Sequence, residues 1–341
     1  MSGEYIGVLS TNDLLYDLLA DEIVDRVLGF GVCRPVFDVY RLDSSSTVFR
    51  YADRRTFVNL VGKFYGNKWL HGRQTGETEL RAMLMQREFD NLQRLRALGL
   101  DHYPHRVVRP LGVSVPINCV LVEDFASGPD LDFYIREATH YGKGDELRSR
   151  LTDVAWFLAD MHNRSETNEL VNDALALAYL DKVIGQLAYW DIISAHQRQR
   201  LACLRKRWAA SRILGVGQQV LIHGDANPTN FRFSGEHGVT IIDLERLQPG
   251  DRAADLGCVV AELKHLFWWY SHDSWASEQY IQHLYATYTS YLHEGAEDYA
   301  ALITRGRFYM GCYELHIGLN AWLDLGYRRR LIENAEECLM I

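Results

Sequence analysis

The chain of 341 residues has few cysteines, no excess of basic residues and no long apolar run, and each shortage argues against a class of protein. Its six cysteines lie far apart without a Cys-x-x-Cys pair, which favours buried reduced thiols over a metal site or disulfides. A nucleic-acid partner requires clustered lysine and arginine, so the formal net charge of −9 argues against one.

The sequence also lacks the signals for a membrane or for secretion. No run approaches the ~20 apolar residues that a spanning helix needs. Residues 1–25 are rich in acidic side chains and lack the basic start and long apolar centre of a secretory signal. We therefore expect a cytoplasmic protein that needs no membrane and works as a monomer or a homodimer.

With 48% hydrophobic and 24% charged residues, the chain can build one large core or two lobes. No internal repeat or low-complexity tract divides it. Strand-like patterns come early and helical patterns late, which predicts an α+β fold. Residues 1–126 are expected to form a small lobe with an antiparallel sheet, and residues 127–341 a larger, mainly helical lobe.

Hydrophobic periodicity indicates the elements of each lobe. An amphipathic helix between Leu14 and Val27, capped by Thr11 or Asn12, is expected to open the chain. The other elements predicted in the small lobe are strands at 35–42, 47–51, 57–65, 106–115 and 117–125 and a helix at 77–97. The larger lobe is predicted to have helices at 147–163, at least two more in 168–214, and others from 255 to the end.

The most informative segment is 220–245, where two short apolar runs each lead to polar residues. The first run is followed by Asp225 and Asn230, and the second by Asp243. Such runs are typical of buried strands that deliver polar groups at their ends. Phosphoryl transfer from ATP needs one carboxylate to orient the attacking hydroxyl and accept its proton. It also needs an amide oxygen and a second carboxylate to hold magnesium.

This segment resembles the aminoglycoside phosphotransferase and choline kinase superfamily, whose members have a His-Gly-Asp-x-x-x-x-Asn catalytic loop and an Ile-Asp-x-Glu metal loop. The residues that carry the resemblance are His223-Gly224-Asp225, Asn230, Ile242-Asp243-Leu244-Glu245 and Gly250-Asp251-Arg252-Ala253-Ala254-Asp255-Leu256. Asn227 stands where many members have His, and Arg252 where Pro is usual. The resemblance extends over most of the chain and implies a protein-kinase-like two-lobe fold with ATP and Mg²⁺ as cofactors.

The matching residues have distinct expected roles. Asp225 is the candidate catalytic base. Asn230 and Asp243 are the candidate magnesium ligands, because Mg²⁺ prefers hard oxygen donors. Glu245 would support the metal or its waters, or else lie on the surface of a loop.

Three further residues near these motifs are expected to have supporting roles. His223 resembles the residue that anchors the catalytic loop rather than a proton donor. The resemblance implies that Asp255 hydrogen-bonds the backbone of that loop, and Asp251 could do the same. Helix capping is the alternative for both aspartates.

Lys63 stands in an otherwise apolar strand, where its ammonium needs a charged partner. The kinase-like pattern implies that Lys63 contacts the α- and β-phosphates of ATP and pairs with a glutamate on the following helix. Glu88 is preferred, with Glu77 and Glu79 as alternatives. The other interpretation is a lysine that snorkels to the surface.

Two more segments complete the expected nucleotide site. Ser45 and Ser46 lie in the turn between two predicted strands, where hydroxyls and backbone amides would cover the phosphates; an ordinary polar hairpin is the alternative. Residues 120–128 resemble the hinge between kinase lobes. By register, the carbonyl of Asp124 and the amide of Ala126 would bind adenine.

The acceptor site is the least determined part of the sequence. The resemblance assigns it to residues 168–214 and 262–325. Aromatic faces there could stack on sugars or hold an ammonium, and carboxylates could pair with amines. The alternative is a helical core rich in aromatics with solvated acids outside. The residues concerned are Phe267, Trp268, Trp269, Tyr270, Trp275, Tyr280, Tyr285, Trp322, Tyr327, Asp273, Glu278, Glu314 and Asp324.

Together these motifs predict an ATP- and Mg²⁺-dependent kinase that phosphorylates a hydroxyl of a small acceptor, namely an amino sugar, another sugar or an amino alcohol. The alternative is a nucleotide-binding pseudokinase with a regulatory or interaction role. It is disfavoured because the base, the metal ligands and the lysine are all present. A protein kinase is disfavoured because His-Gly-Asp replaces His-Arg-Asp and no Asp-Phe-Gly or Ala-Pro-Glu follows.

Overall fold

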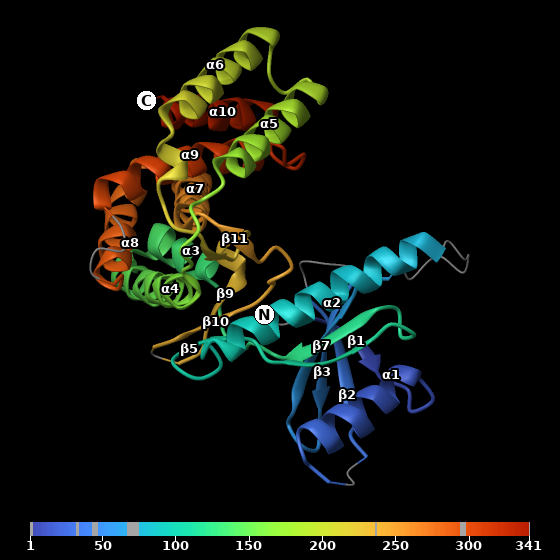
Figure 1. The fold of residues 1–341 in the computed structure, drawn as a ribbon. Helices are drawn as coiled ribbons and strands as arrows, with labels where there is room; N and C mark the ends of the chain where they lie inside the picture. Colours follow the sequence, from blue (N-terminus) through green and yellow to red (C-terminus); the bar gives the residue numbers. More distant parts are fainter. Residues whose placement is uncertain are drawn as a thin grey trace. The chain divides into compact units, whose positions relative to one another are not determined.

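The structure is a computed structural model that describes residues 3–31, 34–42, 47–66, 75–235, 237–293 and 298–340. The chain forms two compact units, shown with their elements in Figure 1. The first unit combines Met1–Pro129 with Ser234–Glu245, and the second combines Asp130–Phe233 with Arg246–Ile341. The division expected from the sequence assigned 234–245 to the helical lobe, whereas this segment belongs to the first unit.

The first unit contains a six-stranded antiparallel sheet in the order β1-β2-β3-β4-β7-β6. Its strands are β1 (Glu4–Val8), β2 (Phe37–Arg41), β3 (Val48–Asp53), β4 (Asn59–Phe64), β6 (Pro110–Ser114) and β7 (Val120–Asp124). Four of these lie within predicted ranges, and β3 extends two residues beyond the predicted 47–51. Strand β1 was not predicted, because it is a short, mostly exposed edge strand without an alternating apolar pattern.

The expected amphipathic helix follows β1 instead of opening the chain. It consists of α1 (Leu14–Asp17) and a π-helical segment, η1 (Leu18–Val27). The predicted caps are wrong: the side chain of Asp13 accepts a hydrogen bond from the amide of Leu15 and caps the helix. Buried apolar side chains of η1 pack with those of β2, β4 and β7 in one hydrophobic core.

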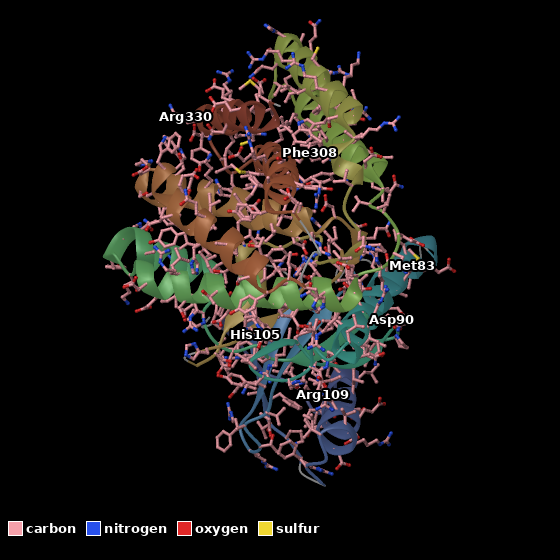
Figure 2. All side chains as sticks on the ribbon, turned by 60° about the vertical axis from the view of Figure 1, so that its left-hand side comes forward. Met83, Asp90, His105, Arg109, Phe308 and Arg330 are labelled. Atoms are coloured by element: carbon pink, nitrogen blue, oxygen red, sulfur yellow. The ribbon has the colours of Figure 1, made fainter. Side chains whose placement is uncertain are left out.

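The long predicted helix is α2 (Thr75–Ala97), which carries Met83 and Asp90 of Figure 2. After it, β5 (His105–Val107) pairs in parallel with β10 (Val239–Ile241). The single strand predicted over 106–115 is thus two separate strands, β5 and β6. The pairing of β5 with β10 explains why residues 234–245 join the first unit.

The second unit is mainly helical, as predicted. Its helices are α3 (Leu131–Tyr141), α4 (Gly144–Ser165), α5 (Asp173–Tyr189), α6 (Ala195–Ser211), α7 (Arg252–Ser271), α8 (Glu278–Ser290), α9 (Tyr299–Ile317) and α10 (Leu325–Leu339). Short strands β8 (Val220–Ile222) and β11 (Gln248–Gly250) pair antiparallel, and β9 (Phe231–Phe233) follows the catalytic loop. In the part of the chain that the structure describes, no helix has both the length and the apolar composition to cross a membrane.

Helices α7 and α9 pack closely in the core of the second unit. A Cβ atom on Gly257 of α7 would lie 2.5 Å from the Cβ of Tyr309 on α9, so a larger residue would force the helices apart. Phe308 of α9 is fully buried and packs 5.0 Å from Trp208 of α6, measured between ring centroids (Figure 2). Helix α7 is thereby held rigidly, which matters because its first turn fixes the catalytic loop.

Candidate active site

The catalytic loop begins directly after β8 with a backbone turn that only glycine fits. Gly224 has φ +76°, in the left-handed region that favours glycine. A Cβ at Gly224 would also lie 2.5 Å from the carbonyl oxygen of Arg246. This turn presents Asp225 at the end of a buried strand, as expected from the apolar run before it.

Asp255, in the first turn of α7, anchors this loop. Its buried carboxylate accepts hydrogen bonds from the backbone amides of His223 and Gly224, at 2.8 and 3.0 Å. The expected backbone contact of Asp255 is therefore present. The ring of His223 is buried, and neither of its nitrogens has a hydrogen-bond partner among the described residues. Its backbone amide, and not its ring, is what ties the loop to α7.

A buried histidine on a neighbouring helix contacts the carboxylate of Asp255. The Nε2 atom of His162 on α4 lies 3.2 Å from Asp255, and its Nδ1 atom lies 2.7 Å from the hydroxyl of Tyr288 on α8. Burial lowers the pKa of His162, although Asp255 opposes this effect, so the ring is neutral near pH 7. Side chains from α8, α4 and α7 thus form one chain of contacts that ends at the Asp255 carboxylate.

Asp225 and Asn230 lie together within the loop. The side-chain nitrogen of Asn230 donates to the backbone carbonyl of Asp225 at 3.0 Å, and Nη1 of Arg246 lies 3.5 Å from the Asp225 carboxylate. Asn227, where relatives often have His, caps the short turn Pro228–Asn230 by accepting from the amide of Thr229. Because Asn230 uses its nitrogen for this contact, its amide oxygen is left for a metal.

The contacts at the start of α7 explain why Arg252 can stand where the family usually has proline. Asp251 caps the helix and accepts hydrogen bonds from the fully buried guanidinium of Arg305, with a shortest distance of 2.8 Å. Arg252 occupies the first helical position, where proline is favoured because its fixed φ suits a helix start. Here Arg252 instead pairs with Glu166 after α4, which neutralises a buried charge.

A further acidic residue lies near the catalytic loop. Burial and the carboxylates of Asp225 and Asp132 raise the pKa of Glu262, on α7, to about 8. Asp132 in turn accepts a hydrogen bond from the hydroxyl of Tyr270, at 2.8 Å. Glu262 is therefore mainly protonated near pH 7 and becomes ionised readily only when a cation lies beside it.

The first unit contains the lysine part of the site. Nζ of Lys63 in β4 lies 2.6 Å from Glu88 of α2, the pairing expected from the sequence. It also lies 3.4 Å from Glu123 of β7 and 3.5 Å from Asp243. Burial lowers the pKa of Lys63, but these three carboxylates outweigh it and raise the pKa well above its usual value. The hydroxyl of Tyr65 also donates to Glu88.

Asp243 follows β10 in an unusual backbone conformation. Its φ is +67°, which aspartate tolerates better than most residues and which is frequent at functional turns. The side-chain nitrogen of Asn91 donates to the next carbonyl, that of Leu244, at 2.8 Å and holds this turn. Carboxylate oxygens of Glu88, Asp243 and Glu245 lie within 4.8 Å of one another. These hard oxygen donors are of the kind that magnesium prefers.

The hinge segment continues from β7. The amide of Asp124 donates to the carbonyl of Arg109, and that of Phe125 to the carbonyl of Asn59. The amide of Ala126 has no acceptor among the described residues, so it is free to donate to a ligand. Ser45 and Ser46 lie outside the described residues, as does the side chain of the alternative lysine partner Glu77.

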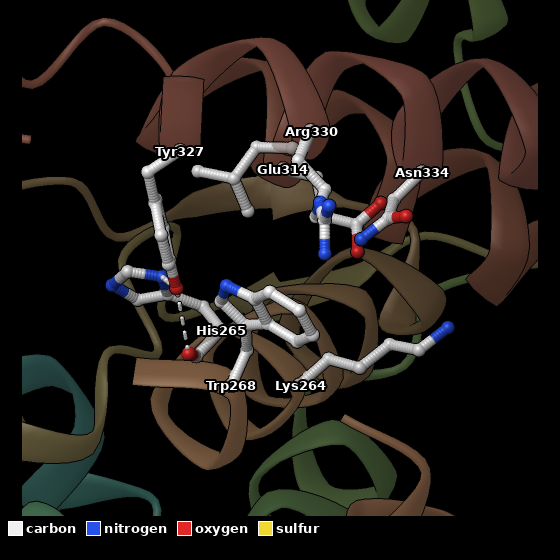
Figure 3. Close-up of a pocket in the computed structure, with 8 residues that line it drawn as sticks. Lys264, His265, Trp268, Glu314, Tyr327, Arg330 and Asn334 are labelled. Carbon is white, nitrogen blue, oxygen red and sulfur yellow. Dashed lines mark hydrogen bonds between the residues drawn. The ribbon is translucent and has the colours of Figure 1, made fainter. Parts of the chain in front are cut away.

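The aromatic residues of the C-terminal helices divide between the core and the surface, where Trp269, Trp275 and Trp322 are exposed. Phe267, Tyr280 and Tyr285 are buried in the core. Trp268, Tyr327 and Glu314 line a small cavity of about 10 Å³ between α7, α9 and α10, enough for one water molecule (Figure 3). The other residues that line it are Lys264, His265, Arg330, Leu331 and Asn334.

Several groups around this small cavity contact one another, whereas Oε1 of Glu314 has no hydrogen-bond partner among the described residues. The hydroxyl of Tyr327 donates to the carbonyl of His265 at 3.0 Å, the dashed line of Figure 3. The guanidinium of Arg330 lies 4.6 Å from the ring centroid of Trp268. For these residues the structure favours the interpretation of a helical core over an acceptor pocket.

Comparison with known proteins assigns the class. The model of the phosphotransferase enzyme family matches residues 76–302, and the chain belongs to this family. It is thus an enzyme of the phosphotransferase class, as the motifs predicted. No curated protein was found to match the sequence.

Solved structures show the same fold. A ternary complex of streptomycin, ATP and APH(2″)-IIa aligns over 98% of this chain and 100% of its own, with a TM-score of 0.59 and 13% identity. An ethanolamine kinase from Plasmodium vivax aligns over 88% and 81%, with a TM-score of 0.56 and 14% identity. The choline kinase LicA from Streptococcus pneumoniae aligns over 88% and 91%, with a TM-score of 0.52 and 17% identity. The predicted protein-kinase-like α+β fold is confirmed.

Three residues near the site, Glu123, Glu262 and His162, were not predicted from the sequence. Glu123 could have been found by the argument used for Lys63, because it is an ionisable residue at the end of an apolar run. Glu262 lies two helical turns after Asp255, so both share one face of α7. His162 gave no local signal, because its partners come from other helices.

Proposed function

We propose that the protein is an ATP- and Mg²⁺-dependent kinase that transfers the γ-phosphate to a hydroxyl of a small acceptor carrying an amine. The observation that carries this proposal is the catalytic loop, in which Asp225 is presented by a glycine turn and held through two amide hydrogen bonds to Asp255. A base must be held this firmly to act on one particular hydroxyl.

In this proposal, the first unit supplies the nucleotide contacts. Lys63 contacts the α- and β-phosphates, and the carbonyl of Asp124 and the amide of Ala126 bind adenine. Asn230 and Asp243 would hold Mg²⁺, which when bound neutralises the phosphate charge. The free amide oxygen of Asn230 and the hard donors around Asp243 fit this ion.

Asp225 acts on the acceptor. Its carboxylate accepts a hydrogen bond from the acceptor hydroxyl and aims the oxygen at the γ-phosphorus. As the new O–P bond forms and the bond to ADP breaks, the hydroxyl proton passes to Asp225. The guanidinium of Arg246, 3.5 Å away, restrains the carboxylate in the meantime.

The charges near Asp225 favour a cationic acceptor. Glu262, Asp225 and Asp132 lie close enough that the two aspartates contribute to the raised pKa of Glu262. An ammonium bound near Glu262 would lower this pKa and pair with the ionised carboxylate. An amino sugar or an amino alcohol is therefore favoured over a neutral sugar.

The test is ADP release with matched acceptor pairs, such as glucosamine against glucose and ethanolamine against ethylene glycol. We expect turnover with an amine-bearing member and a mass increase of one phosphate in that acceptor. Nucleotide binding without turnover across a broad panel would support the pseudokinase alternative. Preferred phosphorylation of the neutral members would contradict the role given to Glu262.

A further inference from the structure

Lys63 is surrounded by three carboxylates that come from three different elements. Glu88 of α2 lies 2.6 Å from Nζ, Glu123 of β7 lies 3.4 Å away, and Asp243 after β10 lies 3.5 Å away. An ammonium has three N–H donors. Two of these donors are directed to Glu88 and Asp243. Glu123 makes no hydrogen bond through the oxygen that faces Lys63 and acts on it through its charge.

Glu123 is the unexpected member of this group. In the antiparallel pairing of β4 with β7, Lys63 is opposite Leu121 and Val61 is opposite Glu123. Lys63 and Glu123 are therefore diagonal neighbours on the same face of the sheet. The side chain of Glu123 is only 2% exposed, and burying a carboxylate is costly unless a cation lies beside it. Lys63 is the cation that meets this need.

Asp243 is the carboxylate of this group that can turn away from Lys63. Its side chain is 41% exposed, whereas those of Glu88 and Glu123 are almost completely buried. It is also the residue with the proposed second task of holding the metal. When its carboxylate turns to Mg²⁺, one N–H of Lys63 becomes available.

We propose that Glu123 is a positioning residue that makes nucleotide binding depend on the divalent metal, because its buried charge helps to compensate that of Lys63 until Asp243 binds that metal. This inference rests on the proposed function, because it assumes that Lys63 binds phosphate and Asp243 the metal. Without metal, a nucleotide meets a lysine whose charge is already compensated by three carboxylates.

Removing Glu123 should loosen this dependence. In Glu123→Met the side chain keeps its length but carries no charge, so the positive charge of Lys63 is compensated by one carboxylate fewer. Glu123→Gln keeps the shape and an acceptor and removes the charge alone. At an effective dielectric constant of about 20, one unit charge changes the binding of another about tenfold even at a separation of roughly 10 Å, so loss of the Glu123 charge should be measurable.

The experiment is calorimetric titration of the full chain with ADP, once with excess Mg²⁺ and once with EDTA. For the wild type we expect binding with Mg²⁺ and much weaker binding in EDTA. Both Glu123 variants should bind ADP about tenfold more tightly in EDTA and nearly as the wild type does with Mg²⁺. Glu88→Gln is the matched control: Glu88 is hydrogen-bonded to Nζ at 2.6 Å and holds the ammonium in place, so its loss should misplace Lys63 and weaken ADP binding in both conditions.

The outcomes separate this inference from the function on which it rests. If the wild type binds Mg²⁺–ADP but the Glu123 variants keep its ratio of affinities with and without metal, Glu123 has no such role. If the wild type binds no ADP in either condition, the proposed function itself fails. Thermal melting checks each variant, and Glu123→Gln decides the question if Glu123→Met does not fold.

Discussion

Asp255 offers the sharpest test of how the catalytic loop is held. Its fully buried carboxylate accepts hydrogen bonds from the amides of His223 and Gly224 and lies 3.2 Å from His162. In Asp255→Asn one oxygen remains an acceptor, but an NH₂ group replaces the other and faces a donor. One backbone amide is then buried without a partner.

The magnitude follows from these contacts. A hydrogen bond to a charged group contributes about 1.5–3 kcal/mol, and a stranded buried donor costs about 1–3 kcal/mol. The free energy that keeps the loop closed should therefore fall by roughly 3–5 kcal/mol in Asp255→Asn. Since about 1.4 kcal/mol corresponds to a tenfold change, amide exchange in the loop should accelerate by at least about 100-fold.

Hydrogen exchange followed by mass spectrometry of peptides covering residues 221–231 measures this effect. Asp273→Asn is the matched control, because Asp273 also accepts hydrogen bonds from two backbone amides, those of Trp275 and Ala276, but is exposed. We expect little change in exchange anywhere in that control. Unchanged protection of the loop in Asp255→Asn would show that something other than this carboxylate holds it.

Three further predictions follow from the site and the buried acids. Asp225→Asn should leave Mg²⁺–ATP affinity intact by calorimetry while transfer, measured by acceptor mass shift, falls by about 10²–10⁴; full activity would remove Asp225 as the base. Asp243→Ala should abolish Mg²⁺-dependent turnover but not the melting transition, and retained turnover would contradict its metal role. Burial raises the pKa of Glu314 to about 7, so the folded state holds a proton that the unfolded state loses above about pH 4.5, and stability declines as pH rises toward 7. Glu314→Gln should thus stabilise the protein by about 3 kcal/mol at pH 8 and by much less at pH 5, and an equal effect at both would refute the assignment.

Much of the secondary structure could be predicted because its signals are local. Alternating residues in β2 and β3 and helical spacing in α2 depend on near neighbours in the sequence. Strand β1 and the cap Asp13 were missed, since a short exposed edge strand and a choice among adjacent polar residues have weak local signals.

The sequence by itself determined the class of chemistry. The spacing of Asp225, Asn230 and Asp243 is a property of the linear chain, and it led to the phosphotransferase family that the comparisons show. The pairing of Lys63 with Glu88 was also foreseen, because a buried ammonium must find a carboxylate and few candidates follow it.

Only the tertiary structure decided which groups surround these motifs. The register of β4 against β7 places Glu123 beside Lys63. Glu262 lies near Asp225 because α7 packs beside the catalytic loop. Residues 234–245 join the first unit because β10 pairs with β5, far away in the chain. Electrostatic and hydrogen-bond interactions act over a few ångströms in space, so a linear pattern cannot specify them until packing brings distant residues together.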